Sequence, residues 1–155
     1  MIPSNSRRRR VSAVVITLNA ATQLEACLHG LSFADEIVVV DCGSTDRTIE
    51  MATARNARVI RQVWLGYGRQ KDFAVSQAVN DWVLCVDADE IVSPELRNSI
   101  EAVLNAPVAG ACGRGRLRCL AGGLRRSGSP GRCNWMFLGS SRNWAGHRLS
   151  PCSGV

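Results

Sequence analysis

The sequence predicts an α/β fold with a mostly parallel sheet and helices on both of its faces. Apolar runs of strand length alternate with segments whose apolar residues recur at helical spacing. At least two runs, 36–41 and 82–87, have no polar face, as expected of strands that are covered on both sides. Polar residues follow several runs at their carboxyl ends, where parallel α/β sheets bind ligands.

The individual elements follow from these patterns. We expect four strands, each a short run rich in Val and Ile: 11–18, 36–41, 58–63 and 82–87. Apolar residues at helical spacing predict a first helix: Leu24, Cys27, Leu28 and Leu31. A second helix should end near Arg55, with Ser44, Thr45 or preferably Asp46 as its cap, and 69–79 should form a third.

A fourth helix is predicted after residue 92. Ser93 is a suitable cap, Pro94 suits the first helical position, and Glu95 is favourable near the positive end of the helix dipole. Its buried stripe is expected to consist of Leu96, Ile100, Val103 and Leu104.

Charge divides the chain into unequal parts. All 13 acidic residues lie at or before Glu101, together with 11 of the basic residues, whereas the remainder carries eight Arg and no acid. Ten of the 14 Gly also follow Pro107. We therefore expect a basic, solvated arm at 1–10, an α/β domain at 11–106 and an irregular basic tail at 107–155.

The tail shows no sustained strand or helix periodicity. Its four Cys lack paired CxxC spacing, which argues against a zinc site. One interpretation is a disordered basic tail that binds RNA or anionic lipid. The preferred one is an out-of-frame end, because a frameshift in GC-rich DNA yields acid-free sequence rich in Arg, Gly, Cys, Ser and Trp.

The location is expected to be cytoplasmic. The basic start and the apolar run after it resemble a signal peptide, but Thr17 and Asn19 interrupt the run, so a strand after a basic arm is favoured. No apolar run approaches the ~20 residues that a membrane span needs. The Cys residues before 107 look like small apolar residues of a reduced interior.

Two acids at the end of the fourth strand suggest a metal site. Asp87 and Asp89 are two residues apart in a turn and can point toward one cation, and Glu90 follows them directly. Mg²⁺ and Mn²⁺ prefer oxygen ligands and share them with substrate phosphates. The alternative is a pair of solvated turn residues.

Other polar residues converge on the same predicted edge of the sheet. Thr17 and Asn19 end the first strand, and Asp41 ends the second, where it can accept a hydrogen bond from a base or a ribose. Gly43 would let a ligand approach the backbone. Lys71 would meet a phosphate or a ribose, with an exposed helical lysine as the equal alternative.

Four segments in this order resemble the family 2 glycosyltransferases: VVITLNA, IVVVDCGSTDRT, GYGRQKDFA and WVLCVDADE. The likeness covers about 11–105 and is strongest to bacterial lipopolysaccharide-core enzymes of the WaaE/KdtX type. It implies a GT-A fold, in which a nucleotide-binding α/β half precedes an acceptor-binding half. It also implies inverting transfer of a sugar from a nucleotide-sugar, a UDP- or ADP-sugar, to a lipopolysaccharide core acceptor.

The resemblance also implies roles for individual residues. Those implied to bind the nucleotide-sugar are Thr17, Asn19, Asp41, Ser44, Lys71 and Asp87. Asp89, with Asp87, would hold Mg²⁺ or Mn²⁺, which stabilises the departing diphosphate. Peripheral contact with the cytoplasmic face of the inner membrane is implied, and no nucleic-acid partner is expected.

Two departures from the family pattern put activity in doubt. Ala20 stands where the family commonly has Glu. The general base of the family is a carboxylate of the second half, but 107–155 contain none, and His147 is the only alternative there. A non-catalytic nucleotide-binding module is therefore the main alternative function. A basic nucleic-acid-binding protein, suggested only by the Arg-rich ends, is the weaker one.

Overall fold

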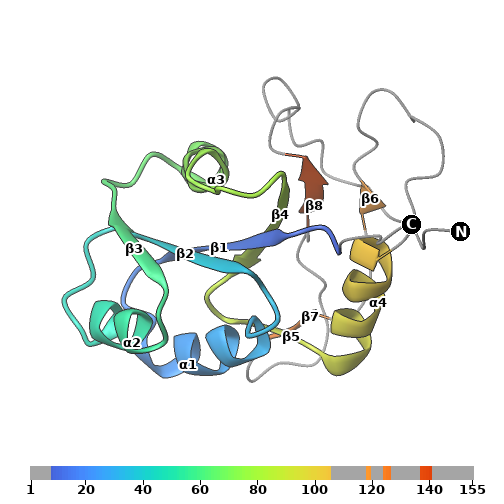
Figure 1. Cartoon of the computed structure of the whole chain (residues 1–155). Helices are drawn as coiled ribbons and strands as arrows, with labels where there is room; N and C mark the ends of the chain where they lie inside the picture. Colours follow the sequence, from blue (N-terminus) through green and yellow to red (C-terminus); the bar gives the residue numbers. More distant parts are fainter. Residues whose placement is uncertain (1–7, 106–117, 120–123, 127–136, 141–155) are drawn as a thin grey trace, which may run out of the picture.

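The computed structural model describes residues 8–105 and three short strand segments beyond them. One six-stranded sheet has the order β3-β2-β1-β4-β8-β6, and β5 and β7 form a separate two-stranded sheet (Figure 1). The strands of the first 105 residues are β1 Val11–Thr17, β2 Glu36–Asp41, β3 Arg58–Arg61, β4 Trp82–Asp87 and β5 Glu90–Val92. The later strands are β6 Arg118–Cys119, β7 Leu124–Arg126 and β8 Phe137–Ser140.

The first four strands are parallel, as predicted. In the register between β1 and β2, Thr17 lies opposite Asp41, and in that between β1 and β4, Ile16 lies opposite Asp87. The carboxyl ends of β1, β2 and β4 therefore meet at one edge of the sheet. This parallel register places the predicted site residues close together.

Helices cover both faces of the sheet, which confirms the predicted fold class. Helices α1 (Ala21–Gly30) and α2 (Thr48–Ala54) lie on one face and α3 (Tyr67–Ser76) lies on the other (Figure 1). Helix α4 (Pro94–Asn105) joins the first layer, because its buried Leu96, Ile100 and Leu104 belong to the same apolar cluster as α1.

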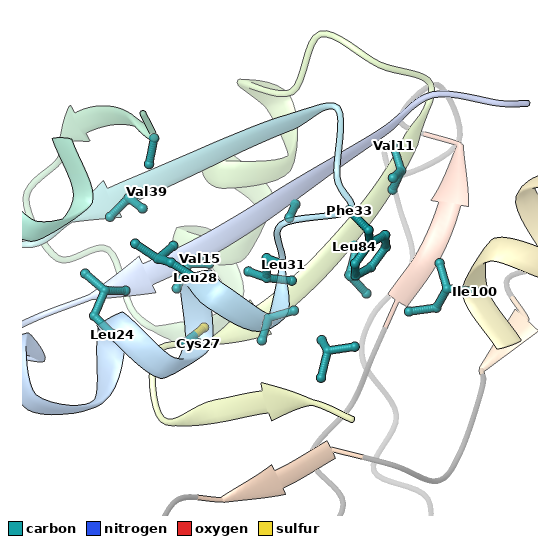
Figure 2. Close-up of a cluster of buried hydrophobic side chains, with 14 of the residues drawn as sticks. Val11, Val15, Leu24, Cys27, Leu28, Leu31, Phe33, Val39, Leu84 and Ile100 are labelled. Carbon is teal, nitrogen blue, oxygen red and sulfur yellow. The ribbon is translucent and has the colours of Figure 1, made fainter. Parts of the chain in front are cut away.

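Strand β1 shows how the two layers are built. All seven of its residues are buried. Val11, Ala13 and Val15 pack toward α1, whereas Val14 and Ile16 pack toward α3, as the period of two of a strand requires. Figure 2 shows the first of these clusters between β1, β2, β4 and α1, with Leu24, Cys27 and Leu28 on the helix and Leu31 directly after it. The buried helical stripe predicted for α1 is thus confirmed.

Several boundaries differ from the sequence expectation. Strand β3 stops at Arg61, and α3 begins at Tyr67 and ends at Ser76, earlier at both ends than predicted. Strand β5 was not predicted, and neither were the short strands within 107–155. Strand β8 pairs antiparallel with β4, and β7 pairs antiparallel with β5. Strands this short lack a periodic pattern of their own and form through pairing with an existing edge.

The predicted helix caps are found with one adjustment. The Ser93 hydroxyl accepts a hydrogen bond from the backbone N–H of Leu96 at 3.2 Å and so caps α4. Arg47, not Asp46, occupies the cap position of α2. Asp46 still accepts from the backbone N–H of Thr48, at 3.0 Å, and therefore satisfies the first turn of α2 from one residue further out.

Part of the basic arm contacts the domain, which differs from the solvated arm expected. Arg8 forms an ion pair with Asp35 at 2.8 Å, and the guanidinium of Arg9 lies 5.1 Å from the ring centre of Trp82. These contacts fix the entry to β1 at the edge of the sheet opposite the site. Among the described residues, no helix is both long and apolar enough to cross a membrane.

Candidate nucleotide-binding site

A cavity of about 730 Å³ lies at the carboxyl ends of β1 and β4. Four of the predicted site residues line it: Thr17, Asn19, Asp87 and Asp89. Asp41, Ser44 and Lys71 do not line the cavity. Asp41 and Ser44 are hydrogen-bonded to residues that do, and Lys71 forms an ion pair with one. The volume falls within the range of cavities that hold ligands of cofactor size.

Asp41 organises the turn at the end of β2. Its side chain is fully buried, and its carboxylate accepts hydrogen bonds from the backbone N–H groups of Gly43 and Ser44, both at 2.9 Å. It also accepts from the hydroxyls of Ser44 and Thr17. Burial alone would raise the pKa of Asp41, but these bonds favour the charged form and lower the pKa below its usual value.

The same turn is joined to the end of β1. The backbone N–H of Asn19 donates to the hydroxyl of Ser44 at 2.8 Å, and the Asn19 side-chain oxygen accepts from the N–H of Thr45 at 2.9 Å. Asn19 adopts a φ of 48° and Gly43 a φ of 108°, so both positions require a left-handed backbone. Thr17, Asn19, Asp41 and Ser44 thus form one hydrogen-bonded network that shapes a wall of the cavity.

Asp87 is held by contacts to its carboxylate and to its backbone. Its Oδ1 lies 2.9 Å from Nζ of Lys71, with both side chains about one-fifth exposed, at 21% and 19%. Its backbone N–H donates to Glu90 Oε2 at 3.0 Å, and its carbonyl accepts from the thiol of Cys27 at 3.6 Å. Lys71 is therefore neither a freely exposed lysine nor a wall of the cavity, and it acts on the site through Asp87.

The ionisable groups around this turn shift the pKa values of their neighbours. Burial by itself would lower the pKa of Lys71, but nearby acidic groups, foremost Cys85 and then Asp87, raise it above its usual value. Burial raises the pKa of Glu90 to about 7, and the charges of Asp87 and Asp89 add to this rise. Glu90 is 1% exposed, and its Oε1 has no hydrogen-bond partner within the described part of the chain. The turn therefore brings the carboxyl groups of Asp87, Asp89 and Glu90 together where they are partly shielded from water.

The donor set fits a cation that shares its ligands with a substrate. Within the described residues, no group of three or more His, Cys, Asp and Glu is arranged to hold a metal ion. Asp87 and Asp89 both line the cavity, and two carboxylates are what the described chain offers there. Mg²⁺ and Mn²⁺ are often held by one or two carboxylates, with substrate phosphates and water completing the shell.

Three contributors to the site were not predicted from the sequence. Trp64 and Tyr67 line the cavity from the loop after β3 and the start of α3, and Gln70 is fully buried and accepts a hydrogen bond from Leu65 of the same loop. The sequence signal for the two aromatic residues was their place, beside glycine, in the predicted loop segment VWLGY. The bond of Glu90 back to Asp87 depends on a tight turn and had no signal in the sequence.

Comparison with known families supports the resemblance noted from the sequence. The family model described as glycosyl transferase family 2 matches residues 12–150. This match extends into 107–155, and the frameshift interpretation of that segment stays a prediction.

Curated relatives of this chain are also named glycosyltransferases. An uncharacterized glycosyltransferase of Rickettsia bellii is 43% identical over 96 residues, which are 61% of this chain and 33% of the relative. The lipopolysaccharide core biosynthesis glycosyltransferase LpsC of Rhizobium meliloti is 36% identical over 101 residues, which are 62% of this chain and 37% of that protein. The chain thus spans about a third of the length of these relatives.

Solved structures agree in fold. Glucosyl-3-phosphoglycerate synthase from Mycobacterium tuberculosis, crystallised with Mn²⁺, UDP and glucosyl-3-phosphoglycerate, superposes with a TM-score of 0.53 and 28% identity. The superposition covers 62% of this chain and 40% of that one. TarS of S. aureus, as its 1–349 fragment, gives a TM-score of 0.51 and 30% identity over 60% of this chain and 31% of its own. On the family match and these likenesses, the chain belongs to glycosyl transferase family 2.

Proposed function

We propose that this chain is the donor-binding part of a glycosyltransferase that uses a nucleotide-sugar and Mg²⁺ or Mn²⁺. The observation that carries the proposal is the position of Asp87 and Asp89 at the end of β4, facing a cavity walled by the ends of β1 and β2. Ligands of parallel α/β sheets bind at this edge. The M. tuberculosis neighbour was crystallised with Mn²⁺ and UDP.

Asp87 and Asp89 would hold the cation, and the cation would neutralise the diphosphate as it leaves the sugar. The chain's own residues prepare that site. Lys71 faces Asp87, and the Glu90 carboxylate and the Cys27 thiol hold its backbone. A carboxylate fixed in this way reorganises little when charge develops nearby. Preorganised charges of this kind usually make the largest single contribution to an enzyme's rate enhancement.

The donor and the acceptor are proposed from relatives. UDP-sugars are the first donors to test because of the neighbour crystallised with UDP, and ADP-sugars are the second. The likeness to LpsC supports a lipopolysaccharide core acceptor. An acceptor of that kind is bound to a membrane, so peripheral contact with the cytoplasmic face of the inner membrane is part of the proposal.

Inverting transfer also needs a general base for the acceptor hydroxyl. Segment 107–155 holds no carboxylate, and His147 lies outside the described residues. This composition favours a second candidate, a nucleotide-binding module without turnover. Sugar transfer to a core oligosaccharide by this chain would rule out the second candidate.

Titration calorimetry tests the proposal. We expect UDP or ADP to bind in the presence of Mn²⁺ and more weakly in EDTA, because the two carboxylates alone repel a diphosphate. The free Mn²⁺ ion and inorganic pyrophosphate serve as partial ligands. Absence of nucleotide binding with and without metal contradicts the proposal. Binding of nucleic acid that weakens steeply with salt would favour the nucleic-acid alternative instead.

A further inference from the structure

The loop between β3 and α3 presents an aromatic pair to the cavity. Trp64 is 46% exposed and Tyr67 is 74% exposed, and both line the cavity that holds Asp87 and Asp89. Their ring centres are 4.8 Å apart and the ring planes lie at 89°. Because the rings meet edge to face, at least one face of each ring remains uncovered by the other.

A buried glutamine holds this loop beside the end of β2. Gln70 is fully buried; its Oε1 accepts from the N–H of Leu65 at 3.2 Å, and its Nε2 donates to Sγ of Cys42 at 3.2 Å. Cys42 directly follows Asp41 and lines the same cavity as Trp64. The aromatic pair therefore shares the cavity with the residue that follows Asp41, and Asp41 is predicted to accept a hydrogen bond from a base or a ribose.

The side-chain acceptors of Asp41 and Asn19 are already used. The Asp41 carboxylate is fully buried and accepts four hydrogen bonds from Gly43, Ser44 and Thr17. The oxygen of the Asn19 side chain accepts from Thr45. A base that enters the cavity therefore finds these acceptors committed, whereas the rings of Trp64 and Tyr67 are exposed to it.

We propose that Trp64, supported by Tyr67, is the platform on which the nucleobase of the donor stacks. Asp41 then acts on the base through the turn that it organises. The inference rests on the proposed function, since it assigns one end of the same cavity. Stacking suits a base because every base has a π face, and loss of one base–aromatic stack weakens binding by roughly five- to hundredfold.

The test compares Trp64→Ala, Trp64→Phe and a control from the same loop, Val63→Ala. Val63 is 78% exposed and is not among the residues that line the cavity. The probes are UDP with Mn²⁺, ADP with Mn²⁺, and pyrophosphate with Mn²⁺. Thermal unfolding of each variant checks that the fold is kept.

We expect Trp64→Ala to weaken the tighter-binding nucleotide about tenfold, within the range for one lost stack, while pyrophosphate affinity is unchanged. Trp64→Phe should recover most of the affinity, because it keeps a ring, and Val63→Ala should change nothing. An unchanged nucleotide affinity in Trp64→Ala overturns the inference. Equal loss of nucleotide and pyrophosphate affinity also overturns it, because the loop would then act by shaping the metal end.

Two further outcomes distinguish a stacking platform from a lipid contact and from a metal site alone. If Trp64→Ala and Val63→Ala both weaken binding to phosphatidylglycerol vesicles and leave nucleotide affinity intact, the loop is a lipid contact and the stacking inference fails. If the wild-type chain binds pyrophosphate with Mn²⁺ but no nucleotide, the stacking inference fails while the metal site stands. If it binds none of the probes, the proposed function fails as well.

Discussion

Nζ of Lys71 lies 2.9 Å from Oδ1 of Asp87, so a lysine of α3 neutralises the first acid of the turn that ends β4. A cation entering between Asp87 and Asp89 must share Asp87 with this ammonium group. A diphosphate that arrives with the cation is attracted by the positive charge of the same lysine. Lys71 is therefore expected to have opposite effects on the two ligands.

Lys71→Met should strengthen binding of Mn²⁺ alone by about tenfold, equivalent to roughly 1.4 kcal/mol, because a competing charge next to Asp87 is removed. The same variant should weaken binding of UDP with Mn²⁺. Arg69→Met, which removes an exposed charge from the same helix, is the matched control and should have little effect on either ligand. Titration calorimetry measures both affinities, and an unchanged Mn²⁺ affinity in Lys71→Met would contradict the role assigned to the ion pair.

Asp89→Asn should remove the Mn²⁺ dependence of nucleotide binding. The change keeps the shape of the side chain and deletes its charge, and Asp89 is only partly buried, so the free energy of unfolding should change by less than about 1 kcal/mol. Calorimetry with and without Mn²⁺, together with thermal unfolding, measures both quantities. If Mn²⁺ still strengthens UDP binding in the variant, Asp89 is not a ligand.

Asp41→Ala should destabilise the fold by about 2–4 kcal/mol and also weaken nucleotide binding without metal. The substitution leaves the N–H groups of Gly43 and Ser44 without their acceptor in a buried turn. Urea unfolding and calorimetry measure the two effects. A variant as stable as the wild type would show that water replaces the carboxylate at no cost.

The lowered pKa of Asp41 also predicts a pH effect. A carboxylate whose folded-state pKa lies below its unfolded value stabilises the fold above the unfolded pKa, near 3.8. This stability is lost as the pH falls through the lower, folded-state pKa. Urea unfolding between about pH 5 and about pH 2 should therefore show a steeper loss in the wild type than in Asp41→Asn. Parallel curves would mean that Asp41 does not contribute to acid unfolding.

Much of the fold was predictable because burial leaves a periodic trace in the sequence. The runs 36–41 and 82–87 have no polar face, and the structure places them as central parallel strands. The cap of α4 was predictable too, since Ser93 and Pro94 stand next to an apolar repeat. Of its predicted buried stripe, Leu96, Ile100 and Leu104 are buried, whereas Val103 is only partly buried. The structure of a position can be predicted from the sequence when residues close to it in the chain determine its environment.

The sequence predicted that the candidate site residues meet at one edge of the sheet, but it did not predict the bonds that each of them makes. Asp41 was expected to meet a ligand, but the structure commits its carboxylate to Gly43, Ser44 and Thr17. A sequence cannot show whether an acid at a strand end faces a cavity or folds back on its own turn. The contact of Lys71 with Asp87 spans two elements and depends on how α3 lies on the sheet.

The final prediction concerns the segment after α4. The described apolar core lies within residues 11–104, so a chain ending at 106 should keep the four parallel strands β1 to β4 and unfold cooperatively. Strand β8 pairs with β4 in register from Trp82 to Cys85, and removing it leaves that edge of the sheet unpaired. An unpaired edge of this kind promotes association between chains.

We therefore expect residues 1–106 to have a melting temperature close to that of the full chain and a greater tendency to self-associate. Neither chain should transfer sugar, because 107–155 supply no carboxylate to act as a base. Differential scanning calorimetry, light scattering and a transfer assay compare the two. Loss of cooperative unfolding on truncation would show that β8 completes the core. Turnover by the full chain alone would show that 107–155 is a working part of the enzyme, and the frameshift interpretation would then be wrong.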